Sequence, residues 1–410
     1  MDAKAYYDIG LSYFGLNVEK KDITAAIKNF ETSFTLGYKD AAYFLGHIYH
    51  YGHGVTKNFQ KALDYYLRGY HSKSYKCGFA LGILFVSEYN KAEEAYIYLE
   101  ASFKGLQEEA DHGDVVSMHL MGGHYYLGFY AKRDLTLALD YFEKASALGY
   151  AESSYMLGFL YDNPEVGIMD SIKAQTYYEL SAKHGHAEAL YILGVQKLKD
   201  NEFKEAYRYL ESAASQNHID AMFMLASYLE VYEKTNTAER LKWLKMAANQ
   251  GHVEAMFKLG QGYHIGTFGN VDMDEAVSWY EKAAVHRDKN ALYNLAMIEL
   301  AKNDKDIPRL LDLLESAAKL DHPHAQYNLG IMYQRGEYVK ENKIKAFELF
   351  KRSANLGFAH AQYNLAVMYY KGDGIPMNKE QGRMWLEKAS DQGLDIASQW
   401  LLKIIEAENK

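Results

Sequence analysis

The sequence has little cysteine and no excess of positive charge. A single cysteine, Cys77, excludes an internal disulfide framework, so nothing in the chain demands an oxidising compartment. Lysine and arginine total 45 against 54 aspartate and glutamate residues, and the net charge is −9. Because proteins that bind nucleic acids normally carry a basic stripe, we expect no nucleic-acid partner.

Long uncharged apolar runs are also missing. No window of about 18 uncharged apolar residues occurs, so no membrane span is expected. The first residues, MDAKAYY, lack the basic region and apolar stretch of a signal peptide. The expected location is therefore the cytoplasm, and a chain that had lost a signal peptide, or a protein secreted by another route, would give the same sequence.

Proline is scarce as well, with four residues in 410, and this scarcity favours helix throughout. A chain of this length is too long for one compact core. A repeat array avoids that limit because each unit buries its apolar face on its neighbours. The 37 tyrosines fit such an array, since two or three positions in each unit call for an aromatic residue.

One short pattern recurs along the chain. Residues 325–333 read AQYNLGIMY, and residues 361–369 read AQYNLAVMY. Each copy leads past a turn into a second apolar helix, so one unit is helix, turn, helix. We use the small residue after the leucine as the marker of each unit. The eleven markers are Gly10, Gly46, Gly82, Gly122, Gly158, Gly194, Ala226, Gly260, Ala296, Gly330 and Ala366.

Two spacings between markers are irregular. The interval from Gly82 to Gly122 is 40 residues, and we assign the extra residues to the segment 107–114, QEEADHGD, as a longer turn between repeats. The interval from Gly194 to Ala226 is 32 residues, and residues 199–202, KDNE, replace a longer loop inside repeat six.

Each first helix, called helix A here, has a packing face. A small residue lies five positions before the marker, and on a helix it shares one broad face with the leucine, the marker and an aromatic residue. Each second helix, helix B, usually ends before a glycine that can adopt the left-handed conformation. These glycines are Gly37, Gly149, Gly185, Gly251, Gly357 and Gly393.

The full pattern resembles the Sel1-like repeat, a relative of the tetratricopeptide repeat. Residues 41–66, AAYFLGHIYHYGHGVTKNFQKALDYY, contain its Tyr-x-x-Gly-x-Gly-Val loop, and residues 363–376 with 385–390 repeat it as YNLAVMYYKGDGIP and WLEKAS. Repeats three, six, seven and nine lack the Gly-x-Gly loop. The resemblance implies an all-α, right-handed superhelical α/α solenoid. We expect about eleven repeats over residues 1–394 as one continuous domain, and a capping helix over 395–410.

The resemblance also implies a function. Similar proteins are non-enzymatic adaptors that bind a peptide or helix of another protein and use no cofactor. One alternative is an immunity protein that neutralises a toxin, for which the acidic charge would suit a basic target. Another is a hydrolase at the cell envelope, which would need clustered titratable residues that the sequence does not show.

A candidate binding surface lies opposite the packing face of helix A, two residues before each marker. Towards the C-terminus this row is polar and consists of Lys258, Asn294, Asn328 and Asn364. Asparagines in register can pair with the backbone of an extended peptide, whatever its side chains. Arg335 and Lys371, five residues after their markers, would add positive charge for a carboxylate. The alternative is that the asparagines are solvated or bonded within their own repeat.

The same row is apolar nearer the N-terminus. Its residues are Phe44, Leu120, Met156, Ile192 and Met224, with Phe159 beside them. They form either a hydrophobic groove for a partner helix or part of a core in a tightly wound stretch. The sequence favours neither alternative.

Other chemical signals are explained more simply by the repeat. His47, His50 and His53 are three residues apart, but no local carboxylate or cysteine completes a metal site. Cys77 occupies the small packing position, so it is expected to be buried. Glu93, Glu94, Glu108 and Glu109 are expected to be solvated. Six further histidines are assigned to turns between repeats, namely His184, His186, His218, His252, His322 and His324. No catalytic residue and no metal site is predicted.

Overall fold

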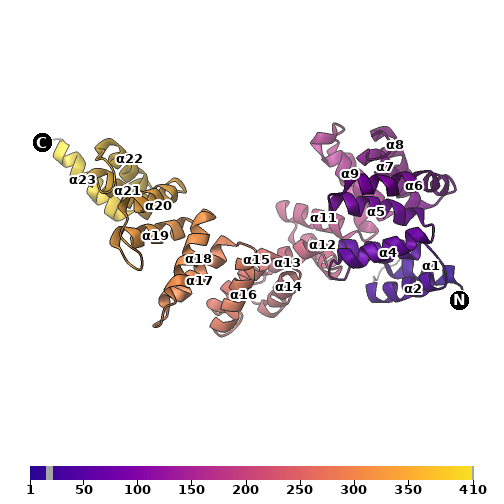
Figure 1. Ribbon diagram of the computed structural model, residues 1–410, viewed down its shortest axis with the longest axis horizontal. Coiled ribbons are helices and arrows are strands. Elements are labelled where there is room, and N and C mark those ends of the chain that lie inside the picture. The colour runs from indigo at the N-terminus through magenta and orange to yellow at the C-terminus, as the bar shows by residue number, and fades with distance from the viewer. Residues whose placement is uncertain (15–21, 409–410) are drawn as a thin grey trace. The chain divides into compact units, whose positions relative to one another are not determined.

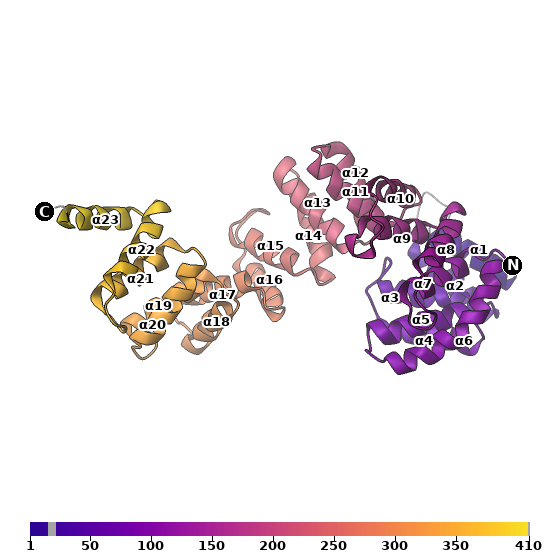
Figure 2. The same cartoon turned by 90° about the horizontal axis from the view of Figure 1, so that it is seen from above.

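The computed structural model describes residues 1–14 and 22–408, and in these residues the chain is built from helices without a β-strand. The helices alternate as A and B members of successive pairs, and consecutive helices lie side by side within each part of the chain (Figures 1 and 2). The chain divides into two compact units, Met1–Gln250 and Gly251–Lys410, which we call unit 1 and unit 2.

The described residues of unit 1 form seven helix pairs. They are α1 (Ala3–Phe14) with α2 (Ile23–Thr35), α3 (Ala41–Tyr51) with α4 (Phe59–His71), α5 (Tyr75–Ser87) with α6 (Ala92–Asp111), α7 (Val115–Leu127) with α8 (Leu135–Ala147), α9 (Ala151–Asp162) with α10 (Ser171–Lys183), α11 (Ala187–Lys199) with α12 (Phe203–Ser215), and α13 (Ile219–Tyr232) with α14 (Thr237–Asn249). A short 3-10 helix, η1 (Pro164–Val166), lies between α9 and α10.

Unit 2, described up to residue 408, has four pairs and a last single helix. They are α15 (Val253–His264) with α16 (Met273–Val285), α17 (Lys289–Ala301) with α18 (Ile307–Lys319), α19 (Pro323–Arg335) with α20 (Lys343–Asn355), α21 (Ala359–Lys371) with α22 (Lys379–Asp391), and α23 (Asp395–Glu408). The eleven predicted repeats and the C-terminal helix are confirmed. One continuous domain over residues 1–394 stays a prediction.

The marker residue is small because helix B places a large side chain against it. A Cβ atom added to Gly330 would lie 2.6 Å from Cε1 of Phe350 on α20, closer than packed atoms approach. Where the marker is Ala366, the residue at the corresponding place on α22 is Leu386, which lacks a ring and is fully buried. The predicted packing face is therefore confirmed at the level of individual contacts.

The turns between repeats also follow the predicted pattern. The glycines after the B helices have positive φ, for example +86° at Gly149 and +89° at Gly357. Repeats without glycine keep this backbone, because Arg287 and Asp321 take φ values of 62° and 56° at the same place. The repeat therefore requires the left-handed conformation here, and glycine is the residue that adopts it with least strain.

Several of the turn histidines begin the A helices. The Nδ1 atom accepts a hydrogen bond from a backbone N–H three residues on, as the side chain of an N-cap residue does. The pairs are His186 with Ala189 (3.4 Å), His218 with Ala221 (3.1 Å), His252 with Ala255 (3.1 Å) and His322 with Ala325 (3.2 Å). Because the acceptor nitrogen must be unprotonated, each cap needs a neutral imidazole.

The wide interval between Gly82 and Gly122 corrects one prediction. The extra residues extend helix B, since α6 runs for 20 residues, whereas its neighbours α4 and α8 have 13. Glutamine, glutamate and alanine are good helix formers. In addition, Glu109 in the last turn of α6 forms an ion pair with the buried Lys76 of α5. The short interval between Gly194 and Ala226 has the predicted cause, a short loop inside repeat six. Helix α11 ends at Lys199 and α12 begins at Phe203, so only three residues join them.

The last helix covers the end of the array in unit 2. Trp400 of α23 contacts the rings of Tyr363 and Tyr370, at 5.8 and 4.9 Å between centroids. Ala397 of α23 is fully buried in the hydrophobic core of the last repeats, whereas Leu402 of the same helix is 60% exposed. The helix therefore caps the preceding repeat, and its outer face keeps some apolar surface. None of the described helices is both long enough and apolar enough to cross a membrane.

Candidate functional site

The polar row predicted on the A helices lies in unit 2. Asn294, Asn328 and Asn364 occupy the same place on α17, α19 and α21, and Lys258 occupies it on α15. All four side chains are half-buried. The row therefore lies at the surface between neighbouring A helices, partly shielded by them, and is accessible in part to a ligand.

Two of the asparagines are bonded to the preceding repeat. The side chain of Asn294 hydrogen-bonds the hydroxyl of Tyr280 on α16, and that of Asn328 hydrogen-bonds the hydroxyl of Tyr293 on α17. Burial raises the pKa of both tyrosines, and the hydrogen bond from the asparagine lowers it. The Nδ2 atom of Asn328 also lies 3.6 Å from the sulfur of Met297. The predicted alternative of internal bonding is thus found here, with the bonds joining neighbouring repeats.

These bonds do not use the whole amide group. A side-chain amide has two N–H donors and a carbonyl oxygen, and the bonds to tyrosine oxygen use a donor. Within the described residues the carbonyl oxygens of Asn294 and Asn328 accept no hydrogen bond, and Asn364 makes no side-chain hydrogen bond. The row therefore offers fixed acceptors for backbone N–H groups.

Two predicted cations lie at the C-terminal ends of the same helices. Arg335 is the last residue of α19 and Lys371 the last of α21, and each precedes a glycine with positive φ that ends the helix. The Arg335 side chain is 67% exposed and lies 4.0 Å from Glu337, at the limit of an ion pair. Lys371 is exposed and has no carboxylate within ion-pair distance in the part of the chain that the structure describes. Both cations can therefore meet an incoming carboxylate.

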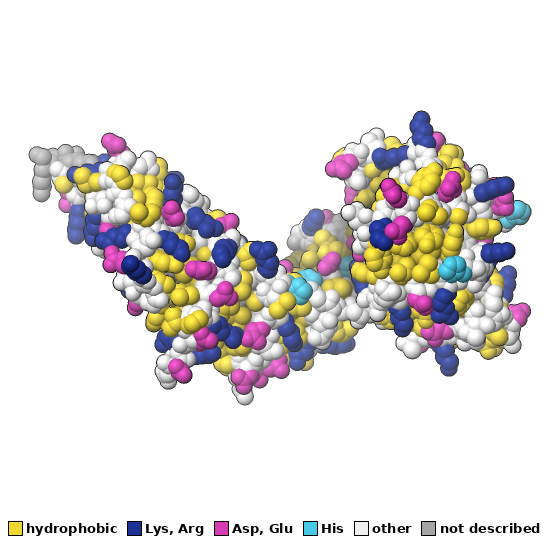
Figure 3. Space-filling view, in the orientation of Figure 1, with side chains coloured by type: hydrophobic (Ala, Val, Ile, Leu, Met, Phe, Trp, Pro, Cys, Tyr) yellow, Lys and Arg dark blue, Asp and Glu magenta, His cyan; other side chains and the backbone are white. Residues whose placement is uncertain are grey.

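The charges on unit 2 are mixed. On the face shown in Figure 3, Lys and Arg side chains lie among Asp and Glu side chains over α16 to α22. The cations at Arg335 and Lys371 are therefore local features of two helix ends.

The apolar row in unit 1 divides into core and surface. Phe44 and Leu120 are 1% and 3% exposed and belong to the hydrophobic core, so for these two residues the core alternative holds and they are not free to line a groove. Phe44 stacks on Phe30 of α2 and packs against Phe14 of α1, so the preceding helix pair covers it. Met156, Phe159, Ile192 and Met224 are half-buried, and for these four residues both alternatives stay open.

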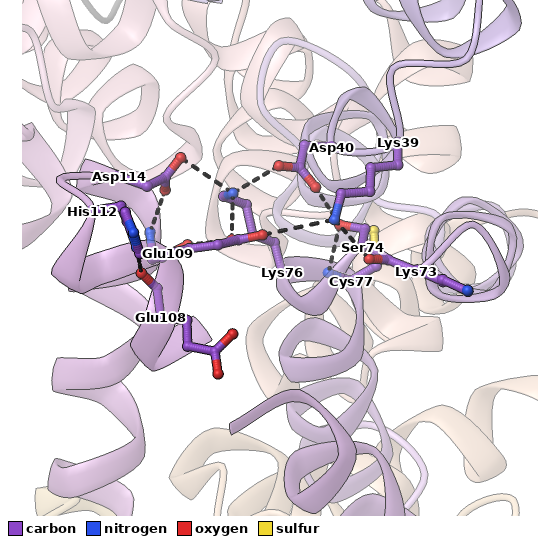
Figure 4. A network of polar contacts seen from close by, with 11 residues as sticks. Lys39, Asp40, Lys73, Ser74, Lys76, Cys77, Glu108, Glu109, His112 and Asp114 are labelled. Carbon is purple, nitrogen blue, oxygen red and sulfur yellow. Dashed lines mark hydrogen bonds and ion pairs between the residues drawn. The ribbon is translucent and has the colours of Figure 1, made fainter. Parts of the chain in front are cut away.

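A buried charge cluster in unit 1 was not predicted. The Lys76 side chain on α5 is 1% exposed, and its Nζ atom lies 2.7 Å from Asp40, 2.9 Å from Glu109 and 3.3 Å from Asp114 (Figure 4). Ser74 donates a hydrogen bond to Asp40 at 2.6 Å, and Ser117 donates one to Glu109 at 2.7 Å. Burial alone would lower the pKa of Lys76, but the three carboxylates raise it above its ordinary value.

The cluster joins three repeats. Asp40 precedes α3, Lys76 lies on α5, Glu109 lies in the last turn of α6 and Asp114 caps α7. The expectation that Glu109 is solvated is therefore wrong. The sequence signal for this cluster is the position of Lys76 directly before the small packing residue Cys77. A lysine at the edge of a packing face needs an acidic partner, because charged side chains are rarely buried without one. The cluster links the repeats on either side of the long helix α6.

The remaining candidates behave as packing residues. Cys77 is fully buried, and burial raises the pKa of its thiol. The rings of His47 and His53 stack at 5.1 Å, and burial lowers the pKa of His47. In the described ranges, no group of three His, Cys, Asp or Glu side chains could hold a metal ion.

Comparison with known proteins identifies the repeat. Nine segments match the Sel1 repeat, namely residues 3–38, 39–72, 115–150, 151–186, 187–218, 219–252, 253–284, 323–358 and 359–394. Repeats three and nine are not matched, and both lack the Gly-x-Gly loop. A search of curated proteins finds no match.

Solved structures with the same repeat are similar to this chain. A protective antigen of uropathogenic Escherichia coli, described as displaying an SLR fold, is 25% identical with a TM-score of 0.64, and the match covers 99% of this chain and 88% of that one. A Sel1 repeat protein of Oxalobacter formigenes is 25% identical with a TM-score of 0.47, covering 50% and 86%. An immunity protein of Pseudomonas aeruginosa is 21% identical over 52% of this chain and 83% of that one, and its TM-score of 0.32 is too low to bear on function.

Proposed function

Because this chain belongs to the Sel1 repeat family, whose members are generally protein-interaction scaffolds, we propose that the A-helix face of unit 2 binds an extended segment of a partner protein. The observation that carries the proposal is the register of Asn294, Asn328 and Asn364 on successive A helices, with carbonyl oxygens that the described chain does not use. A segment that lies across these helices would donate backbone N–H groups to the row.

The tyrosine hydrogen bonds support the proposal because they fix two of the asparagines before a ligand arrives. A side chain that is already ordered loses less entropy on binding, and about 0.5–1.5 kcal/mol per immobilised side chain is saved in this way. The bonds from Asn294 to Tyr280 and from Asn328 to Tyr293 hold the amide groups in place without using their carbonyl oxygens.

The cations at the helix ends support an acidic feature in the partner. Arg335 and Lys371 lie seven residues beyond Asn328 and Asn364, two turns further along the same helix face. A guanidinium or ammonium group binds a carboxylate with charge-assisted hydrogen bonds. The partner segment should therefore carry an acidic side chain or its C-terminal carboxylate on the side of these helix ends.

A photo-crosslinking amino acid at position 364 tests the proposal. Asn364 is half-buried and makes no side-chain hydrogen bond with the described residues, so its replacement should leave the fold intact. Glu348, an exposed residue on α20 of the neighbouring helix pair, is the matched control position. Illumination in an extract of the native cell should capture a protein through position 364, excess unlabelled chain should prevent the capture, and position 348 should not give the same product. Equal capture through both positions would contradict the proposal.

A further inference from the structure

A pocket in unit 1 lies where two repeats have unusually short turns. Only residues 200–202 join α11 to α12, and only 233–236 join α13 to α14, whereas residues 52–58 join α3 to α4. The short turns leave the adjoining helix ends uncovered, and Val231 and Tyr232 are 58% and 50% exposed. Next to them is a pocket of about 470 Å³ lined by Lys204, Tyr207, Arg208, Tyr228 and Glu233.

The pocket contains two cations without acidic partners. Lys204 and Arg208 are one turn apart on α12, both are exposed, and neither has a carboxylate within ion-pair distance in residues 1–14 and 22–408. Like charges at this spacing disfavour a helix slightly. With Glu233, the lining carries two positive charges and one negative charge. A bound anion would neutralise the excess and relieve the repulsion.

The acidic side chains near the two cations, apart from Glu233 in the lining, have partners other than Lys204 and Arg208. Glu202 and Glu205 lie 2.8 and 3.4 Å from Lys197 on α11. Glu239 accepts hydrogen bonds from the Tyr207 hydroxyl at 3.1 Å and from Trp243 at 3.2 Å. The two cations therefore stay available without any rearrangement of the helix pair.

Aromatic rings form the rest of the pocket wall. The rings of Tyr207 and Tyr228 lie 5.6 Å apart, and Tyr228 contacts Tyr232 at 5.0 Å. The Tyr207 hydroxyl is held by Glu239, so its ring is fixed. Ligand pockets of about 300–1,000 Å³ that combine aromatic walls with a few polar groups are typical of small-molecule sites.

We propose that this pocket binds an aromatic compound that carries a phosphate group. The guanidinium of Arg208 and the ammonium of Lys204 contact the phosphate, since arginine matches its oxygens in a fork and lysine acts as a point charge. The ring packs on Tyr207 and Tyr228 in an offset or edge contact. A free nucleotide and a phosphorylated tyrosine of a protein share this chemistry.

Calorimetric titration of the full chain with phenyl phosphate tests the site. We expect saturable binding, with inorganic phosphate weaker by about tenfold or more because it lacks the ring. The variant Lys204→Glu with Arg208→Glu should bind phenyl phosphate at least about tenfold more weakly. The control variant Lys132→Glu with Lys183→Glu makes the same change of charge at two exposed lysines of unit 1 outside the pocket, and its affinity should stay within about twofold.

Three results would overturn the proposal. They are no binding of phenyl phosphate at about 10 mM, equal binding by the Lys204 and Arg208 variant, and equal affinity for inorganic phosphate. Both cations are exposed, so the variant should fold, and its helical circular dichroism verifies this. Titration with adenosine monophosphate and with a phosphotyrosine peptide then separates the two sources, since the tighter of them identifies the class of ligand.

Discussion

The ammonium group of Lys76 lies 2.7 Å from a carboxylate oxygen of Asp40, although the two residues belong to different repeats. Glu109 of the same helix pair as Lys76 and Asp114 of the next repeat complete the cluster around the same ammonium group. A buried charge of this kind is stable only while its partners are present. The cluster therefore makes the second, third and fourth repeats depend on one another.

Removing the lysine should destabilise unit 1 strongly. In Lys76→Met, the carboxylates of Asp40 and Glu109 remain near a buried apolar group, and the free energy of unfolding should fall by about 3–5 kcal/mol. Urea denaturation measures the change. Adding Asp40→Asn and Glu109→Gln to Lys76→Met should recover part of the loss, because fewer uncompensated charges remain. A loss below about 1 kcal/mol would mean that the cluster is no stronger than a surface ion pair.

The marker glycine of repeat ten allows a test of the packing rule. Gly330→Ala should lower the free energy of unfolding by about 1–3 kcal/mol, because the new methyl group would meet the ring of Phe350. Adding Phe350→Leu reproduces the pair formed by Ala366 and Leu386 in repeat eleven, so the double variant should be more stable than Gly330→Ala alone. Thermal unfolding compares the three chains. If Phe350→Leu makes the Gly330→Ala chain less stable, the contact between position 330 and the ring of Phe350 is not what limits the size of the marker residue.

The histidine caps should make the fold sensitive to acid. Burial, which is the largest cause, and the His324 and Lys289 charges together lower the pKa of His322 to about 4. The unfolded chain therefore binds a proton at this histidine near pH 6.5 while the folded chain does not, so stability is full above pH 6.5 and falls between pH 6.5 and 4, by up to about 1.4 kcal/mol per pH unit for one such group.

A single substitution isolates the contribution of this histidine. His322→Asn keeps a side-chain acceptor at the N-cap and removes the titrating group. The free energy of unfolding of His322→Asn, measured from pH 7 to pH 4, should depend less steeply on pH than that of the wild-type chain. Identical slopes for the two chains would show that His322 does not take part in the acid response.

The helices could be predicted from the sequence because the same packing residues recur at the same positions in most repeats. The small residue before each marker, the marker itself and the glycine after helix B recur in register, and the structure places Ala325, Gly330 and Gly357 as expected. The extension of α6 was predicted as a turn, because nothing local to residues 107–111 reveals that Glu109 has a partner on α5.

The candidate sites were harder to predict because they depend on contacts between repeats. A periodic pattern gives the position of Asn328 on its helix, but it does not show that Tyr293 of the preceding repeat takes one of its donors. Phe44 and Met156 occupy equivalent positions in the sequence, yet Phe44 is buried and Met156 only half-buried. Phe44 is buried because Phe14 and Phe30 of the preceding helix pair cover it, and the position of Phe44 within its own repeat does not reveal these contacts.

The dissociation constant of the segment captured through position 364 tests the central claim most directly. It should be measured by calorimetry for the wild-type chain and for the combined variant Asn294→Ala, Asn328→Ala and Asn364→Ala, with unchanged helical circular dichroism as the check on folding. Each lost hydrogen bond should weaken binding by about 0.5–1.5 kcal/mol, so the triple variant should bind at least about tenfold more weakly. The same dissociation constant for both chains would contradict the claim that the asparagine row binds the partner.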